Sequence, residues 1–395
     1  MKRKVIFSFC MLLSSIFALT GCQPSESTDS RPTPTPDTSQ SHSSKSTEAD
    51  HQNNADSSKE TVSISATGDT GKKAAFSNQY YGPLHVNGTF LCDQYDNPIQ
   101  LKGLSTHGLG WYPEYVNAGL FQSFQEDWNM NVIRLAMYTE EYNGYCISDD
   151  AQKKNLKSLI HQGIQIAQDL DLYVIVDWHI LSDNNPLTHV EEAMDFFDEI
   201  SAAYKDDPHI LYEICNEPNG NTSWEDIKSY ADQVIPVIRK NAPESIIIVG
   251  TPTWSQDVDI ASQSPVEGYE NLMYTLHFYA DTHRDDLRNK MVTAIENGLP
   301  VFVSEYGICD ASGNGPINLE EANRWVALMN QYKISYVAWN LSNKDESSAI
   351  LKSTCKKTSN FTNEDLSDSG QWLKSMLIDA SAGSDSENKD TSSSS

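Results

Sequence analysis

Leu211-Tyr212-Glu213-Ile214-Cys215-Asn216-Glu217-Pro218 is the stretch that decides the fold of this chain. Its apolar character is continuous rather than alternating, which is typical of a strand that is buried on both faces of its sheet. The run at residues 301–307, Val-Phe-Val-Ser-Glu-Tyr-Gly, has the same pattern and carries Glu305 near its end. A carboxylate at the end of a buried strand faces a cleft, so Glu217 and Glu305 are candidate functional residues.

Short apolar runs rich in β-branched residues recur along the chain, at residues 99–103, 132–135, 173–177, 210–214, 245–249, 273–276, 299–303 and 335–339. Helical periodicity lies between them, most clearly over residues 151–170 and 224–239. The spacing from Glu217 to Glu305 corresponds to about 29 residues for each of three βα units, close to the roughly 31 of an eight-unit barrel. We therefore predict an α/β fold, a (β/α)8 TIM barrel whose strand ends meet at one mouth. Two turn signals within residues 84–100 predict a hairpin that plugs the barrel floor.

Four segments are expected along the chain. A basic start and an apolar run over residues 5–19, shorter than the roughly 20 residues of a membrane span, predict a signal peptide over residues 1–21. Leu19-Thr20-Gly21-Cys22 resembles a bacterial lipobox, in which Cys22 becomes lipidated; an ordinary cleavage site beside a chance cysteine is the alternative. Composition predicts a disordered linker over residues 22–74, one folded domain over 75–379 and a disordered tail over 380–395. We thus expect an extracellular lipoprotein anchored to the membrane surface.

Charge and cysteine content restrict the possible partners. The formal net charge of −27 argues against nucleic acids and other polyanions, which need a basic surface. Five of the seven cysteines lie outside the first 22 residues. They are widely scattered and odd in number, so we predict neither a disulfide framework nor a cysteine-based metal site. We expect a monomer that acts on a neutral or cationic substrate.

Motifs at the expected strand ends follow one another at barrel-unit spacing, at residues 103–109, 133–138, 177–179, 212–218, 277–280, 304–307 and 339–344. In this order they resemble glycoside hydrolase family 5 of clan A, and within it the bacterial endo-β-1,4-glucanase group. The resemblance covers residues 80–377. Asn216-Glu217-Pro218 alone would be a weak signal, whereas the ordered series is specific.

The resemblance implies that Glu217 is the acid/base and Glu305 the nucleophile of a retaining double displacement, with carboxyl groups about 5–5.5 Å apart. Arg134 would keep Glu305 ionised, and the Tyr279 hydroxyl would donate to the same carboxylate. Asn216 would hold the sugar 2-hydroxyl.

Histidines and aromatic side chains complete the expected site, because sugar rings present apolar faces that pack on aromatic rings. His179 and His277 would orient the sugar and Glu217. The resemblance implies that Trp254 lies on the leaving-group side, and Trp339, with Tyr279 and His179, would also contact substrate. By the same resemblance, the glycone-side residues are His107, Trp111, Tyr112, Tyr138, Ala311, Ser312, Lys344 and Glu346.

Plainer interpretations accompany these roles. Glu217 also suits a helix entry, and Lys344 and Glu346 also suit a solvated charge pair. Arg134 is harder to explain structurally, because an unpaired guanidinium inside an apolar strand costs several kcal/mol. The histidines and glutamates show no close-spaced metal motif, and the resembled family needs no metal, so we expect neither metal nor cofactor.

The expected function is a surface-tethered retaining endo-β-1,4-glucanase acting on cellulose or mixed-linkage β-glucan. A mannanase, xylanase or xyloglucanase of the same mechanism is one alternative. A lipoprotein that binds oligosaccharides without turnover is the alternative from another class.

Overall fold

The computed structural model describes residues 80–386. The signal peptide predicted over residues 1–21, the linker over 22–74 and residues 387–395 of the tail lie outside that part of the chain. Within it, no helix combines the length and the apolar character that crossing a membrane requires.

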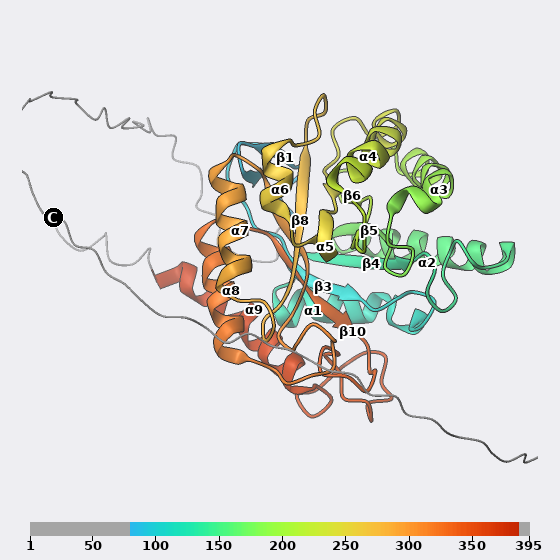
Figure 1. Ribbon diagram of the computed structural model, residues 1–395. Coiled ribbons are helices and arrows are strands. Elements are labelled where there is room, and N and C mark those ends of the chain that lie inside the picture. The colour runs from blue at the N-terminus through green and yellow to red at the C-terminus, as the bar shows by residue number, and fades with distance from the viewer. Residues whose placement is uncertain (1–79, 387–395) are drawn as a thin grey trace, which may run out of the picture. The chain divides into compact units, whose positions relative to one another are not determined.

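Parallel strands form a closed barrel with the helices around its outside (Figure 1). The barrel strands are β3 Lys102–Thr106, β4 Val132–Tyr138, β5 Tyr173–His179, β6 Ile210–Glu213, β7 Ile247–Val249, β8 Leu272–Tyr279, β9 Val301–Gly307 and β10 Tyr336–Leu341. They pair in chain order, and β10 closes the circle by pairing with β3. The predicted (β/α)8 fold and its predicted strands are therefore confirmed, and the carboxyl ends of the strands share one mouth.

The helices follow the strands in the order expected of βα units. The longer ones are α1 Ala118–Trp128, α2 Asp150–Asp169, α3 Val190–Ala203, α4 Trp224–Arg239, α6 Val258–Gln263, α7 Asp285–Glu296, α8 Leu319–Gln331 and α9 Asp368–Ser386. Short elements are η1 Pro113–Tyr115, η2 Pro186–His189 and α5 Pro252–Ser255, the last of which is a left-handed turn.

Helix α4 shows how local sequence sets a boundary. The Ser223 hydroxyl accepts a hydrogen bond from the Asp226 amide at 3.2 Å, and the Asp226 carboxylate accepts one from the Ser223 amide at 2.9 Å. This capping box satisfies two amides that the helix itself cannot pair. The helix starts at Trp224 and ends at Arg239, as its periodicity predicted.

A hairpin closes the lower end of the barrel, opposite the carboxyl ends of the strands. Its strands are β1 His85–Asn87 and β2 Phe90–Cys92. Leu84, Leu91 and Leu101 pack with barrel residues such as Tyr173 and Phe302 in one buried cluster. The predicted floor is thus confirmed. Because Ile99 and Leu101 belong to this floor, strand β3 starts at Lys102, later than the run at residues 99–103 predicted.

The last helix extends past the domain boundary that composition predicted at residue 379. Leu373 and Leu377 of α9 are buried against the rest of the barrel. Adding residues to an existing helix needs no new nucleation, so α9 continues to Ser386 despite the serine- and glycine-rich composition.

Candidate active site

The mouth of the barrel holds a cavity of about 600 Å³ into which side chains from most of the strand ends project. Most of the predicted site residues lie along it. The lining consists of His107, Tyr138, His179, Leu181, Glu217, Trp254, Gln256, His277, Tyr279, His283, Glu305, Ala311, Ser312, Gly313, Trp339, Lys344 and Glu346.

Arg134 on strand β4 lies beneath this cavity and is fully buried. Its Nε atom donates to Glu213 at 2.7 Å, and Nη1 donates to Glu305 at 3.1 Å. Nη2 lies 2.6 Å from Oδ1 of Asn216 and 3.0 Å from Oδ2 of Asp177. The guanidinium therefore joins groups from strands β5, β6 and β9, which satisfies a charge that would be costly to bury alone.

Opposing charges set the protonation of the groups around Arg134. Burial by itself raises the pKa of Glu213, but Arg134 and His277 outweigh it and lower that pKa to about 2. Burial likewise favours neutral His277, whereas its interactions with Glu213 and Glu217 raise its pKa to about 9. His277 therefore carries a proton at neutral pH and is a second cation in the cluster.

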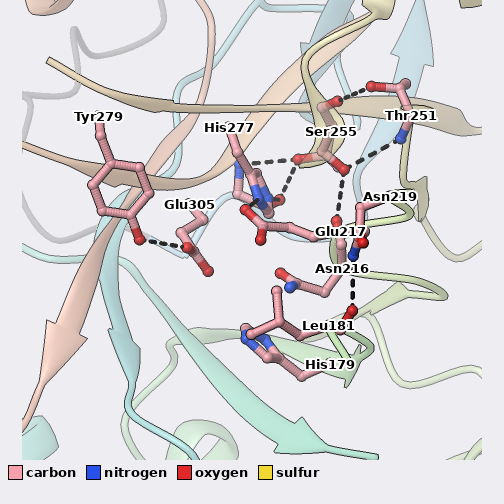
Figure 2. Close-up of polar contacts among 12 residues, drawn as sticks. His179, Leu181, Asn216, Glu217, Asn219, Thr251, Ser255, His277, Tyr279 and Glu305 are labelled. Atoms are coloured by element: carbon pink, nitrogen blue, oxygen red, sulfur yellow. Dashed lines mark hydrogen bonds and ion pairs between the residues drawn. The ribbon is translucent and has the colours of Figure 1, made fainter. Parts of the chain in front are cut away.

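Glu305 on strand β9 and Glu217 just after strand β6 face each other in the cavity (Figure 2). Glu305 accepts hydrogen bonds from Arg134 and, at 2.8 Å, from the Tyr279 hydroxyl, as predicted. Glu217 contacts Nδ1 of His277 at 2.9 Å, and its side chain is 12% exposed against 5% for Glu305. One carboxylate oxygen of each lies within 4.8 Å of the other.

The separation of the two carboxylates decides which displacement fits. Inverting glycosidases keep their carboxyl groups about 6.5–9.5 Å apart to admit a water, whereas retaining ones hold them about 5–5.5 Å apart. The nearest oxygens of Glu217 and Glu305, within 4.8 Å of each other, favour the closer arrangement, in which one carboxylate attacks directly and the other transfers the proton.

Part of the cavity lining is aromatic. His179 lies parallel to the Trp339 ring with centroids 5.1 Å apart, and its Nδ1 contacts Asp177 at 2.6 Å. Burial lowers the pKa of His179 to about 3, and it lowers that of His107 to about 3 as well. Both imidazoles are therefore neutral at pH 7 and offer hydrogen bonds without a charge.

Trp111 and Tyr112 are not among the residues that line the cavity, so their expected contact with substrate stays a prediction. Both rings pack against His107, which does line it, at centroid distances of 5.3 Å and 5.1 Å. Lys344 lies over the Trp111 ring and pairs with Glu346 at 2.6 Å. Lys344 and Glu346 therefore form an ion pair and also line the cavity.

Asn216 has protein partners at both ends of its amide. Its oxygen accepts from Arg134, and its nitrogen donates to the Ile180 carbonyl at 3.1 Å. The side chain is fully buried and outside the cavity lining, so its expected contact with a sugar hydroxyl stays a prediction.

Sequence reasoning assigned no role to several residues of the site. Asp177, Glu213 and Ser304 form the buried network, and Ser304 donates to Glu213 at 2.6 Å. The signal was available in part, because Glu213 interrupts an apolar strand in the same way as Arg134. Leu181, Gln256, His283 and Gly313 line the cavity from loops, where spacing carries little information.

Glu217, His277 and Glu305 are also close enough to one another for their ligand atoms to hold a metal ion. Both ring nitrogens of His277 already contact protein oxygens, and a protonated imidazole has no lone pair for a metal. The trio is therefore better suited to proton transfer and nucleophilic attack. That neither metal nor cofactor is needed stays a prediction.

Comparison with known proteins agrees with this chemistry. The sequence-family description "Cellulase (glycosyl hydrolase family 5)" matches residues 92–345. Endoglucanase A of Butyrivibrio fibrisolvens is 48% identical over 296 residues, which are 75% of this chain and 68% of that protein.

Solved structures are similar over the same region. The cellulase Cel5C_n superposes with a TM-score of 0.72 at 44% identity, covering 76% of this chain and 94% of that one. The catalytic domain of Thermobifida fusca endoglucanase Cel5A, solved with cellotetraose, has a TM-score of 0.71 at 39% identity. The match covers 75% of this chain and 98% of that one.

The protonated state of His277 predicts how stability depends on pH. Its pKa is raised from 6.5 to about 9 in the folded chain, so its contribution is complete below pH 6.5 and is lost as pH rises through 9. We expect the difference in unfolding free energy between wild type and His277→Asn, measured by urea unfolding, to shrink across this window.

The surface residue His85 supplies the control, since His85→Gln removes an imidazole from outside the site. NMR of the wild-type imidazole gives a second readout, in which His277 should titrate near pH 9. A stability difference that does not change with pH, together with an imidazole titrating near 6.5, would contradict the assignment.

Proposed function

This chain belongs to glycosyl hydrolase family 5 and is a glycoside hydrolase of the cellulase type, and from that premise we propose that it is a retaining endo-β-1,4-glucanase. Its substrates would be cellulose and mixed-linkage β-glucan. The observation that carries the proposal is the short separation of Glu217 and Glu305, each in a different environment.

In the first step Glu305 attacks the anomeric carbon while protonated Glu217 donates its proton to the departing glycosidic oxygen. The bond between the anomeric carbon and that oxygen breaks, and a covalent glycosyl-enzyme forms. Glu217 then takes a proton from water, whose oxygen displaces Glu305. Arg134 and Tyr279 hold one oxygen of Glu305 each, which orients the carboxylate for attack.

The shape of the cavity supports cleavage inside a chain. Trp339 and Trp254, the latter 45% exposed, both line the cavity that holds the two carboxylates, and Trp254 is the residue expected on the leaving-group side. Sugar rings can therefore pack on both sides of the broken bond. The net charge of −27 also disfavours acidic polysaccharides.

The same arrangement suits a mannanase, xylanase or xyloglucanase of this mechanism, since the paired carboxylates act on any β-glycosidic bond. Binding without turnover is disfavoured. A binding protein gains nothing from burying Arg134 beneath two facing carboxylates, because desolvating charges is costly.

Hydrolysis of a polysaccharide panel tests the function. On soluble cellulose, mixed-linkage β-glucan, xyloglucan, mannan and xylan, we expect kcat/KM to be at least about tenfold higher for the first two. Proton NMR of the first product should show the β anomer at the new reducing end. Glu305→Gln should lose hydrolysis of all five polysaccharides.

Two results would contradict the proposal. An α anomer as first product would exclude the double displacement. A preference for mannan, xylan or xyloglucan would show that β-1,4-glucans are not the main substrate class. Equal activity of wild type and Glu305→Gln would remove Glu305 as the nucleophile.

We further propose that the enzyme is a lipoprotein held on the outer face of a bacterial membrane through Cys22. The support is the Leu-Thr-Gly-Cys sequence after a basic and apolar start, with a Ser-, Thr- and Pro-rich stretch following it. A long flexible stretch would let the catalytic domain reach an insoluble substrate. The monomeric state stays a prediction.

Expression of the full chain in a bacterial host tests this anchoring. Wild-type protein should partition with membranes and enter the detergent phase, whereas Cys22→Ser should be released with unchanged specific activity. Ser25→Ala, also in the predicted linker, should behave like wild type. Membrane association of Cys22→Ser equal to that of wild type would overturn the anchor.

A further inference from the structure

We propose that Ser255 is a positioning residue for Glu217, and that its hydroxyl couples the acid/base to the leaving-group surface formed by Trp254. The inference rests on the proposed function, in which Glu217 transfers the proton. Ser255 is fully buried beside the cavity and does not line it, so it acts through other residues.

Three consecutive carbonyl groups around Glu217 each accept a hydrogen bond, two of them from the turn α5. The Asn216 carbonyl accepts from the Ser255 hydroxyl at 2.6 Å, and the Pro218 carbonyl accepts from the Trp254 amide at 2.9 Å. Between them, the Glu217 carbonyl accepts from the Asn219 side chain at 2.9 Å. The turn therefore holds the backbone on both sides of the acid/base.

The hydroxyl of Ser255 is itself oriented. Its oxygen accepts a hydrogen bond from the Thr251 amide at 3.2 Å, and the Ser255 amide donates to the Thr251 carbonyl at 3.1 Å. A hydroxyl has one proton, and here that proton goes to Asn216. Removing the hydroxyl leaves a buried carbonyl and a buried amide without these partners.

The backbone of the turn needs such support. Thr253, Trp254 and Ser255 have φ values of 58°, 54° and 54°, a left-handed conformation that residues with a Cβ disfavour. Strained backbone of this kind persists where its surroundings hold it, and it gathers at functional sites. Here the strained turn places the Trp254 ring in the cavity wall while its amide binds Pro218.

The coupling has a chemical consequence that a purely structural role lacks. Protonation by Glu217 matters most when the leaving group is a sugar alkoxide, and it matters little for a dinitrophenolate, which departs without a proton. In the proposed function, Trp254 would likewise contact only a leaving group that is a sugar ring. Loss of the Ser255 hydroxyl should therefore damage the two kinds of substrate unequally.

The experiment compares kcat/KM for cellotetraose and 2,4-dinitrophenyl β-cellobioside, because kcat/KM reports the steps up to the first irreversible one. For Ser255→Gly we expect about a tenfold to hundredfold loss on cellotetraose, as small displacements of catalytic groups produce. On the dinitrophenyl substrate the loss should stay within about twofold, since proton donation is not needed there. Glycine also relieves the left-handed strain, so comparison with Ser255→Ala, which keeps the Cβ, separates the effect of the hydroxyl from that of the backbone.

Ser255→Ala repeats the loss of the hydroxyl and replaces the glycine variant if that one does not fold. Ser335→Ala is the matched control, because Ser335 is a buried serine at the barrel floor whose hydroxyl accepts from the Leu101 amide at 2.9 Å. It should lower Tm without changing the ratio of the two kcat/KM values.

Equal losses on both substrates, or no loss on either, would overturn the role of Ser255 while leaving the proposed function intact. A wild-type enzyme that hydrolyses neither substrate would overturn both. Selective loss on cellotetraose supports the inference.

Discussion

The pairing of the Arg134 guanidinium is the interaction on which the site depends. A guanidinium inside a barrel has to find acceptors for its donors, because an unpaired buried charge destabilises the fold by several kcal/mol. Asp177, Glu213, Asn216 and Glu305 supply those acceptors from three different strands or their ends. Only a closed parallel barrel brings these strand ends into one ring, so the fold and the charge network require each other.

From this centre the two functional glutamates acquire different surroundings. Glu305 lies directly on the guanidinium and accepts from Tyr279, which holds it for nucleophilic attack. Glu217 contacts protonated His277, and its backbone is held by hydrogen bonds from Ser255 and Asn219. The two acids thus differ in their surroundings, because Glu305 is the more buried and lies on a permanent cation, whereas Glu217 is the more exposed and contacts a titratable imidazole.

Sequence reasoning succeeded where a local pattern of residues is enough to determine the structure. Continuous apolar runs predicted the strands, and a charge inside such a run singled out Arg134. The contact of Arg134 with Glu305 was implied by the family resemblance. The pattern did not indicate which other acids meet the guanidinium, because Asp177 and Glu213 are brought to it only by barrel closure. The positions of Trp111 and Tyr112 depend on packing against His107, which residue spacing cannot supply. The left-handed turn at Trp254 contains no glycine and therefore gave no local signal.

The central claim, that Glu305 is the nucleophile held by Arg134, is tested most directly by trapping the glycosyl-enzyme. A 2-deoxy-2-fluoro-β-cellobioside with a dinitrophenyl leaving group forms the covalent intermediate and slows its hydrolysis. Peptide mass spectrometry should find one fluorocellobiosyl group on Glu305 in the wild-type enzyme and none in Glu305→Gln. A label on Glu217, or complete absence of a label from an active enzyme, would contradict the account.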